Sequence, residues 1–539
     1  MAHTPLFRFL QRAIRTARST APQAAHPAPG GRPRTLSRRR LLRYSTLVAA
    51  AAVTTSALAY SDRLRPGGEV PGPRIAVVGG GIAGLSAAYH LQKLGLAATV
   101  YETKAQVGGR MQSRDDLVVR GLVNDLGGCF VNSDHDDLLS LIDELGLTVF
   151  DRSTALRDGV PKTAFYFDGR TIPEADLIAA LGPIAEQVGR DADLLEVDFD
   201  WYATIFDALS VADYLDLHSD KIPEDYVRAL LETTIRTEYG VEPEESSALQ
   251  LLFNLPTVAD GVEPISSDEA FLVQGGSGLV PVALAAKLDG YIRTGWRLEG
   301  LRSQANTFTL SFNRGTVEAD YVVLALPLAA LRQVDLQVEL PTGLGRFIRE
   351  VNLGRNEKVF AGFSDRTWHQ PTGFTTDAWA DLGYSALWED TQRQGEFRQG
   401  VLTFYLGGDQ AQLDGTKAAE KGPQFVNSLK QHIPALGQPV ERFSRTYWGQ
   451  DRDIGGGYTS FKPGQYTEFS GYLYIESDDP DERQDVAVGN LVFAGEQFSD
   501  EYYGFMNGGA QTGRLAAEVV ASRVGAIPPA AADRYLHRA

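Results

Sequence analysis

A run of glycines around residue 80 has the spacing of a turn that binds phosphate groups. Three glycines spaced Gly-x-Gly-x-x-Gly follow an apolar run and begin a helix-like stretch, and a glutamate ends the next apolar run 23 residues after the first glycine. In a strand–helix–strand unit such glycines let the backbone approach a pyrophosphate, and the acid accepts hydrogen bonds from ribose hydroxyls. The helix N-terminus then faces the phosphate charge. The sequence therefore predicts a dinucleotide site, formed by Gly79, Gly81, Ile82, Ala83, Gly84 and Glu102.

A second glycine turn bears on which dinucleotide binds. Gly108, Gly109 and Arg110 follow shortly after Glu102. In FAD oxidoreductases that resemble this chain, such a turn brings more backbone to the pyrophosphate, and the arginine adds positive charge. A free-standing NAD-binding fold does not need it; the alternative is a surface turn with a solvated arginine. We therefore expect FAD, with Gly109 and Arg110 among its contacts.

Composition narrows the classes of function. The chain has 539 residues, a length that suggests roughly two to four domains. Its formal net charge of −18 argues against nucleic acid as a partner. Cys129 is the only cysteine, so an intramolecular disulfide is excluded, and no histidine and cysteine cluster suggests a metal site.

The N-terminal segment has the layout of an export signal. Residues 1–59 contain ten arginines and no acid or lysine. The stretch 37–43 reads Ser-Arg-Arg-Arg-Leu-Leu-Arg and precedes an apolar run that ends in a small-x-small cleavage pattern at residues 57–59. It resembles a twin-arginine signal, whose machinery exports folded proteins, so FAD would be inserted before transport. We expect a periplasmic or extracellular protein; an uncleaved, membrane-tethered form is the alternative, although residues 44–59 are short for a membrane span.

Hydrophobic periodicity predicts both helical and sheet regions. Residues 136–145 and 224–238 have apolar positions three and four apart, as amphipathic helices do. Residues 321–327 are apolar throughout, as a parallel strand buried on both faces is. Nucleotide-binding signals occur near the start, middle and end, so we expect an α/β fold: a discontinuous Rossmann-type FAD-binding domain with an inserted α+β substrate-binding domain. The expected parts are the signal (1–59), a linker (60–73), the FAD-binding domain (74–134, 271–334 and 484–525), the substrate domain (135–270, mainly helical, and 335–483) and a tail (526–539).

Taken together, the motifs resemble those of one family. Over about residues 74–525 the chain is similar to flavin-dependent amine oxidases of the monoamine and polyamine oxidase group, which are related to L-amino-acid oxidases. The resemblance rests on the two glycine turns, Asn124-Asp125-Leu126-Gly127-Gly128, Lys358, Gly457-Tyr458, Ala494-Gly495-Glu496 and Gly508-Gly509-Ala510-Gln511-Thr512-Gly513.

The resemblance implies further cofactor contacts. Glu496 would hold the ribityl or pyrophosphate part of FAD, the Met506 N–H would meet the isoalloxazine, and the Leu298 backbone would contact adenine. Some animal relatives bind the flavin covalently through a cysteine, but Gly457 stands at that position here, so we expect non-covalent FAD. The other residues that the family pattern adds to the cofactor site are Gly127, Gly128 and Gly495.

Three residues are expected at the reacting end of the site. In the family, the lysine at the position of Lys358 hydrogen-bonds a water next to flavin N5. Tyr458 and Phe505 match the two aromatic positions that flank the substrate amine, where two π faces hold an amine and exclude water. The resemblance thus implies hydride transfer from an amine to flavin N5. The products would be an imine, then an aldehyde and ammonia, and hydrogen peroxide.

The substrate class stays open between amines and amino acids. L-amino-acid oxidases of the superfamily often carry an arginine shortly after the Leu-Gly of this segment to grip the carboxylate, whereas this chain reads Cys129-Phe130 there. That favours an amine, but an arginine from elsewhere, such as Arg236, could serve an L-amino-acid oxidase or dehydrogenase for basic amino acids. Cys129 is expected to be a small buried filler.

Two other functions are compatible with the glycine motifs. A carotenoid- or porphyrinogen-type desaturase shares the glycine motifs but is expected to lack the Lys358 and Tyr458 contexts. A flavin-binding protein without turnover would keep FAD and never have it reduced by a substrate. The expected partners are a small amine or amino acid, oxygen or a respiratory acceptor, the twin-arginine export machinery and a second copy in a homodimer.

Overall fold

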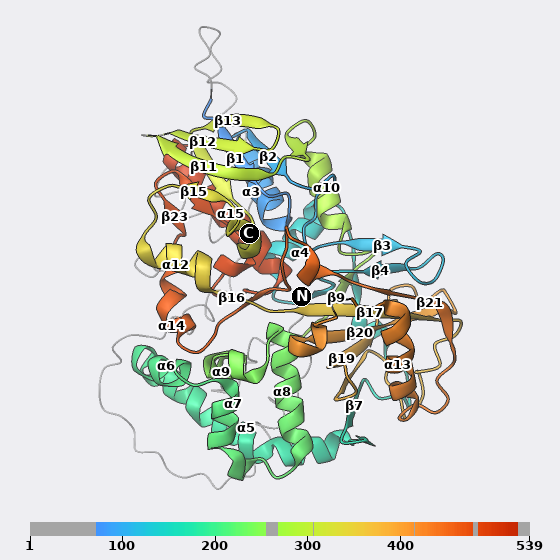
Figure 1. Ribbon diagram of the computed structural model, residues 1–539. Helices are drawn as coiled ribbons and strands as arrows, with labels where there is room; N and C mark the ends of the chain where they lie inside the picture. The colour runs from blue at the N-terminus through green and yellow to red at the C-terminus, as the bar shows by residue number, and fades with distance from the viewer. Residues whose placement is uncertain (1–71, 255–267, 305–306, 414, 478–482, 527–539) are drawn as a thin grey trace, which may run out of the picture.

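One sheet collects strands from the start, middle and end of the chain, as the discontinuous FAD-binding domain requires. The computed structural model describes residues 72–254, 268–304, 307–413, 415–477 and 483–526 (Figure 1). The expected signal, most of the linker and almost all of the tail lie outside these residues. The six-stranded sheet has the order β10 (Ile292–Thr294), β2 (Ala98–Glu102), β1 (Ile75–Val78), β14 (Tyr321–Leu324), β24 (Leu491–Phe493) and β23 (Ala487–Val488).

The central strands of this sheet are parallel, and only the edge strand β23 is antiparallel. All four residues of β1 and all three of β24 are buried, as are the last three of β14. The predicted apolar strand at 321–327 is therefore confirmed, although regular pairing ends at Leu324. Burial on both faces explains why these strands lack an alternating polar pattern.

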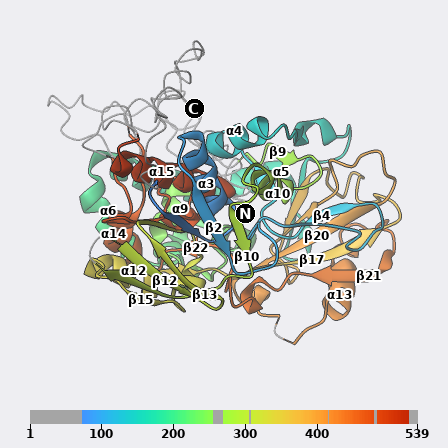
Figure 2. The same ribbon diagram turned by 90° about the horizontal axis from the view of Figure 1, so that it is seen from above.

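Two helices cross closely on one face of this sheet. α3 (Ile82–Lys93) and α15 (Met506–Val524) lie side by side in both views (Figures 1 and 2). A Cβ on Gly509 would lie 2.7 Å from the Ile82 side chain, and a Cβ on Gly513 would lie 2.3 Å from the Ala83 carbonyl oxygen. Only glycine permits this approach, which brings the N-termini of both helices to the same place.

A second sheet forms the centre of the substrate domain. Its seven strands are antiparallel except for the pair β18–β7. Every residue of β17 and β20 is buried. The strands are, in sheet order, β21 (Pro439–Arg445), β17 (Asn356–Phe363), β20 (Gly400–Gly407), β19 (Ala386–Glu389), β18 (Asp377–Ala380), β7 (Thr163–Phe167) and β8 (Arg170–Thr171).

Helices cover the substrate domain at the end away from the FAD-binding sheet (Figure 1). They are α5 (Glu174–Val197), α6 (Phe199–Asp207), α7 (Val211–Leu217), α8 (Asp225–Tyr239) and α9 (Ala248–Asn254). The remaining helices are α4 (Asp136–Glu144), α10 (Leu279–Lys287), α11 (Leu328–Leu331), α12 (Thr342–Glu350), α13 (Ala418–Lys430) and α14 (Gln465–Phe469).

Two smaller sheets and two strand pairs complete the sheets of the described residues. They are β13 (Gly315–Ala319), β12 (Thr307–Phe312), β11 (Leu298–Gln304) and β15 (Asp335–Gln337); β5 (Phe130–Val131), β9 (Phe271–Val273) and β6 (Val149–Asp151); β3 (Ser113–Asp115) with β4 (Val123–Asp125); and β16 (Asn352–Leu353) with β22 (Thr459–Ser460). None of the helices in the described residues is both long and apolar enough to cross a membrane.

The predicted helices are confirmed, each within one residue at either end, as α4 and α8. The part of the substrate domain predicted as mainly helical also contains strands, of which β7 is the longest. Its sequence, Thr-Ala-Phe-Tyr-Phe, is rich in aromatic residues that fit a pleated surface. Pairing with β18, more than 200 residues later in the chain, makes it a strand.

Replacing Gly513 with valine is expected to separate α3 from α15. The new side chain would meet the Ala83 backbone, which cannot move aside, and overpacking of this kind costs about 1–3 kcal/mol of unfolding free energy. Thermal melting should show the loss, together with weaker FAD retention. Gly182→Val is the matched control, because a Cβ on Gly182 in α5 meets nothing within 4 Å. Equal stability of the two variants would contradict this account of the helix crossing.

Candidate active site

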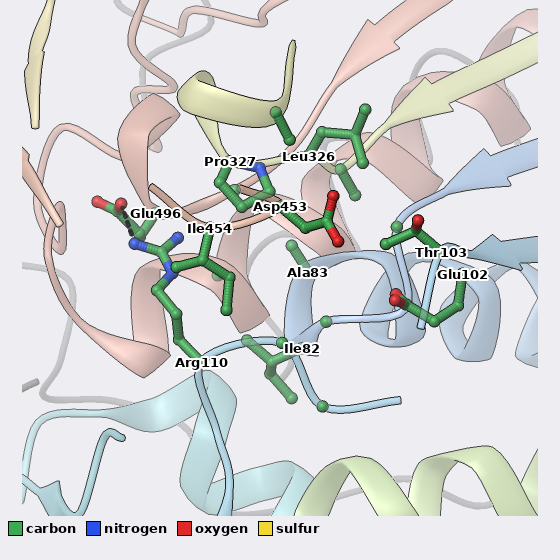
Figure 3. A pocket seen from close by; sticks show the side chains of 18 of the residues that line it. Ile82, Ala83, Glu102, Thr103, Arg110, Leu326, Pro327, Asp453, Ile454 and Glu496 are labelled. Atoms are coloured by element: carbon green, nitrogen blue, oxygen red, sulfur yellow. Dashed lines mark hydrogen bonds and ion pairs between the residues drawn. The ribbon is translucent and has the colours of Figure 1, made fainter. Parts of the chain in front are cut away.

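A large cavity opens where the two helix N-termini meet the FAD-binding sheet (Figure 3). It holds about 1380 Å³ of empty space, its open mouth included. It is bordered by residues from all three parts of the FAD-binding domain. The predicted residues that line it are Gly79, Gly81, Ile82, Ala83, Glu102, Gly109, Arg110, Gly128, Leu298, Gly495, Glu496, Phe505 and Met506.

Two glycine turns form a bare backbone cradle in this cavity. Gly79 has φ +112°, and a Cβ there would lie 2.3 Å from the Ala325 carbonyl oxygen. A Cβ on Gly109 would lie 3.3 Å from the Gly81 Cα, so the two turns face each other without side chains between them. The Gly108 N–H donates to the Gly80 carbonyl at 2.8 Å and joins the turns. Such a cradle beside a helix N-terminus fits the diphosphate of FAD.

Two predicted glycines serve packing and do not line the cavity. A Cβ on Gly84 would lie 1.9 Å from the Gly79 carbonyl oxygen, so Gly84 lets α3 start directly behind the turn, as its place in the motif predicts. A Cβ on Gly127 would lie 1.6 Å from the Arg110 carbonyl oxygen. Gly127 therefore lets its segment pack against the backbone of the second turn. It does not line the cavity, so its predicted contact with the cofactor stays a prediction.

Glu102 lies at the end of β2, where the motif places it. Its carboxylate accepts hydrogen bonds from the Gly80 N–H at 2.8 Å and the Lys104 N–H at 2.7 Å. Burial raises the pKa of Glu102, and these two backbone donors oppose the rise. Each carboxylate oxygen has a second lone pair for a ribose hydroxyl.

Arg110 and Glu496 form an ion pair across the cavity wall (Figure 3). One Arg110 nitrogen donates to the Glu496 carboxylate at 2.9 Å and to the Gly457 carbonyl at 2.7 Å. The other Glu496 oxygen accepts from the Gly504 N–H at 2.8 Å. The pair thus ties the second glycine turn to the segment that leads into α15.

The start of α15 supplies further donors to the cavity. Phe505 precedes the helix, and Met506 is its first residue. The first N–H groups of a helix have no partner within the helix, so those at the start of α15 are free to bond the cofactor. The Phe505 ring packs edge-on against His135, with ring centres 4.9 Å apart. The structure therefore brings Phe505 to the cavity as predicted, while its contact with substrate stays a prediction.

Lys358 lies just behind the cavity lining. Its ammonium donates to the Asp125 carbonyl at 3.0 Å and the Gly127 carbonyl at 2.6 Å, and it stands 5.2 Å from the centre of the Trp388 ring. It is buried on β17, and the Gly127 carbonyl that it holds is adjacent to Gly128, which lines the cavity. The lysine is thus one residue away from the cofactor space, and its role at flavin N5 stays a prediction.

A buried charge network that the sequence analysis missed surrounds this lysine. Arg393 donates to the Asp125 carboxylate at 2.8 Å, and both side chains are fully buried. Asp390 accepts from the Asn124 side chain at 2.6 Å. Burial raises the pKa of Asp390, and the nearby Lys358 charge opposes the rise. Asp125 lies within a motif that could have marked it, but Arg393 is 268 residues away and carries no local signal.

Tyr458 is buried in an aromatic cluster beside the cavity. Its hydroxyl donates to the Thr237 carbonyl and lies 3.1 Å from the Tyr405 hydroxyl. The Tyr405 ring in turn packs against Trp388, with ring centres 5.1 Å apart. Tyr458 is not part of the described lining, so its contact with substrate also stays a prediction. Tyr405 and Trp388 are neighbours of the site that the sequence analysis did not identify.

Acidic side chains on the substrate side lie next to this cluster. Glu238 on α8 is 1% exposed and Glu269 is 2% exposed. Arg152 pairs with Glu269 at 3.0 Å and with Asp377 at 3.3 Å. Burial is the main cause that raises the pKa of Tyr405, and repulsion from both glutamates adds to it. The surroundings of the aromatic cluster are therefore rich in acidic side chains.

Two expectations about single residues concern Arg236 and Cys129. Arg236 pairs with Glu242 at 2.7 Å and with Glu232 at 3.5 Å, so its charge is already matched, and its use as a carboxylate ligand stays a prediction. Cys129 is buried in the apolar core with the Lys358 ammonium 3.7 Å from its sulfur, and burial raises the pKa of its thiol to about 11. The expectation that it fills space is confirmed.

Comparison with known proteins agrees with this geometry. A family model described as flavin containing amine oxidoreductase matches residues 82–521. Polyamine oxidase 3 of Oryza sativa subsp. japonica is 26% identical over 473 residues, covering 84% of this chain and 90% of that protein. Amine oxidase (flavin-containing) B of Canis lupus familiaris is 26% identical over 478 residues, covering 84% and 87%. The solved cyclohexylamine oxidase of Brevibacterium oxydans IH-35A shares the fold with a TM-score of 0.71 at 22% identity, covering 84% and 100%.

Replacing Glu496 with glutamine is expected to weaken FAD binding. The substitution removes the charge that pairs with Arg110 and one acceptor at the start of the segment before α15. Hydrogen bonds to charged groups contribute about 1.5–3 kcal/mol, so the Kd for FAD should rise about 10-fold or more. Titration of flavin fluorescence measures it. Glu468→Gln, which breaks an exposed ion pair with Arg346, is the control and should leave the Kd unchanged.

Proposed function

Since the chain belongs to the family of flavin-containing amine oxidoreductases and oxidises amines with FAD, we propose that its substrate is a diamine or polyamine and not an amino acid. FAD, held by the two glycine turns and the start of α15, would supply the two-electron oxidation of the amine carbon, and oxygen would be the acceptor of the electrons. The protein supplies a dry site, the orientation of the amine and the charges around it. The resulting imine hydrolyses to an aldehyde and ammonia, or a smaller amine.

The observation that carries this proposal is the pair of buried glutamates near Tyr405 and Tyr458. Glu238 on α8 is 1% exposed, and after burial and the neighbouring Tyr405 it adds to the raised pKa of Tyr458. It follows Thr237, whose carbonyl accepts the Tyr458 hydroxyl. A substrate that presents one amine to the flavin and carries a second ammonium farther along would bring that charge toward Glu238.

The numbers of acidic and basic side chains near the tyrosines also favour a diamine or polyamine. Arg152 is shared between Glu269 and Asp377, so the three acids of this region exceed its one arginine. Burial raises the pKa of Glu269 well above its ordinary value, and Arg152 opposes the rise. A buried region that holds more acidic side chains than arginines favours a cation and opposes a carboxylate.

The amino-acid alternative has less support. Arg236, the arginine considered for a carboxylate, pairs with Glu242, and the buried Arg152 pairs with Glu269. The name of the rice relative, a polyamine oxidase, supports the proposed class. The family match leaves the desaturase and the non-catalytic flavoprotein without support.

Three substrates of equal chain length separate these classes. 1,5-Diaminopentane, pentylamine and lysine differ only in the second ammonium or the carboxylate. We expect kcat/KM for the diamine to be about 10–100-fold above that for either of the others, as one charge-assisted contact allows. Anaerobic bleaching of the flavin and peroxide release measure it. Faster flavin reduction by lysine than by 1,5-diaminopentane would favour the amino-acid alternative.

Glu238→Gln tests the residue that carries the proposal. We expect kcat/KM for 1,5-diaminopentane to fall about 10-fold or more and that for pentylamine to change little, because only the diamine has a second charge. Glu232→Gln is the matched control on the same helix, since Glu232 pairs with Arg228 and Arg236. A parallel loss with both substrates would mean that Glu238 acts on stability and not on specificity.

We further propose that the protein is exported folded, with FAD bound, through the twin-arginine route. The support is the arginine-rich leader, in which Arg38 and Arg39 precede an apolar run that ends at Ala59. Replacing both arginines with lysine should keep most of the protein in the cytoplasm with its leader uncleaved. Fractionation and mass determination of the N-terminus measure this, and Arg12→Lys with Arg15→Lys is the control. Unchanged export of the first variant would rule out this route.

A further inference from the structure

A short segment of the substrate domain reaches into the cofactor cavity. Residues 451–454, here called the strap, lie between the turn η7 (Trp448–Gln450) and β22. Arg452, Asp453 and Ile454 line the same cavity as the glycine turns. Figure 3 shows Asp453 and Ile454 among the side chains around this space.

Three residues of the FAD-binding domain bind three successive residues of the strap. Lys104 forms an ion pair with Asp451. The Gln333 side chain donates to the Arg452 carbonyl at 2.7 Å. Arg297 forms a two-point ion pair with Asp453, one contact of which measures 2.9 Å. These partners come from separate places: after β2, after α11 and just before β11.

These three contacts lie at the half of the cavity in which the adenosine of FAD is expected. Lys104 is two residues after Glu102, the predicted ribose ligand, and Arg297 directly precedes Leu298, the predicted adenine contact. Lys104, Arg297 and Gln333 themselves line the cavity. The strap and its partners therefore surround the part of the site in which the nucleotide end of FAD is expected.

Both ion pairs are of the kind that can open. The side chains of Lys104 and Asp451 are 30% and 27% exposed, and those of Arg297 and Asp453 are 30% and 13% exposed. The Arg297 hydrogen bond lowers the pKa of Asp453, so this pair is kept at neutral pH. Part-exposed pairs are individually weak and are screened by salt.

The residues on either side of the strap are anchored to the rest of the protein by hydrogen bonds. The Trp448 indole donates to the Leu126 carbonyl at 3.2 Å, and the Gly457 N–H donates to the Gly354 carbonyl at 2.7 Å. Gly455, with φ +73°, lets the chain turn against Ala329, where a Cβ would lie 2.4 Å from the Ala329 Cβ. A short segment that is anchored at both ends and held in its middle by part-exposed ion pairs can move without unfolding the domain.

We propose that the strap holds the adenosine half of bound FAD in place and that the ion pairs Lys104–Asp451 and Arg297–Asp453 set the rate at which FAD leaves. Asp451 and Asp453 are thus positioning residues for the cofactor, which act through Lys104 and Arg297. The strap has to open for FAD to enter, and it closes once the nucleotide is seated. Retention of FAD is the property that an enzyme with a non-covalent cofactor needs.

The experiment measures FAD release from the purified holoenzyme by the rise of free flavin fluorescence after dilution. In Asp451→Asn with Asp453→Asn, release should be about fivefold faster at low salt, because two weak ion pairs are lost. In the wild type, release should accelerate with added NaCl, and in the variant it should depend little on salt. The control Glu468→Gln breaks an exposed ion pair away from the cavity and should release FAD as the wild type does.

A charge exchange keeps the proposal testable if the double variant is unstable. Lys104→Asp alone should release FAD faster, and adding Asp451→Lys should restore slow release. Release that is unchanged in the neutral variant would overturn the proposal, as would slower release, which would mean that the freed Lys104 and Arg297 attract the diphosphate. The assay contains no amine, so its outcome is independent of the proposed substrate class.

Discussion

The close crossing of α3 and α15 is the contact on which the rest of the site depends. Gly509 and Gly513 stand where any side chain would collide with the first turn of α3. Because the helices touch there, both begin at the same cavity, and their free N–H groups and dipoles converge on one place. The first and last helices of the FAD-binding domain thus build a single anion site. This requires β1 and β24 to lie in one sheet on either side of β14.

Buried charge joins the two domains behind that cavity. The FAD-binding domain supplies Asp125, and the substrate domain supplies Lys358 and Arg393. A buried charge is tolerated only where partners surround it. The same rule applies on the substrate side, where Arg152 is matched by Glu269 and Asp377. These networks hold charged groups beside the cavity without exposing them to water, so their fields act at short range in a medium of low polarity.

The two halves of the site differ in which atoms form them. The cofactor half is mostly backbone atoms of glycine turns and helix N-termini, which suit FAD in general. The substrate half proposed here consists of side chains from the second sheet and from α8, among them Tyr405, Trp388 and Glu238. Backbone geometry is shared across a family, whereas individual side chains set charge and shape. That division explains why the cofactor is easier to infer than the substrate.

The sequence by itself determined the cofactor half, since a glycine turn, its helix and its acid lie within about thirty residues and local spacing decides their geometry. It also indicated the family, the predicted helices and the buried strand. Only the tertiary structure decided which distant residues meet. Arg393 reaches Asp125, Tyr458 reaches the Thr237 carbonyl, and Arg297 reaches Asp453, each across more than 150 residues. Such pairs leave no periodic or local mark in a single sequence, because their partners become neighbours only when two sheets pack around a common cavity.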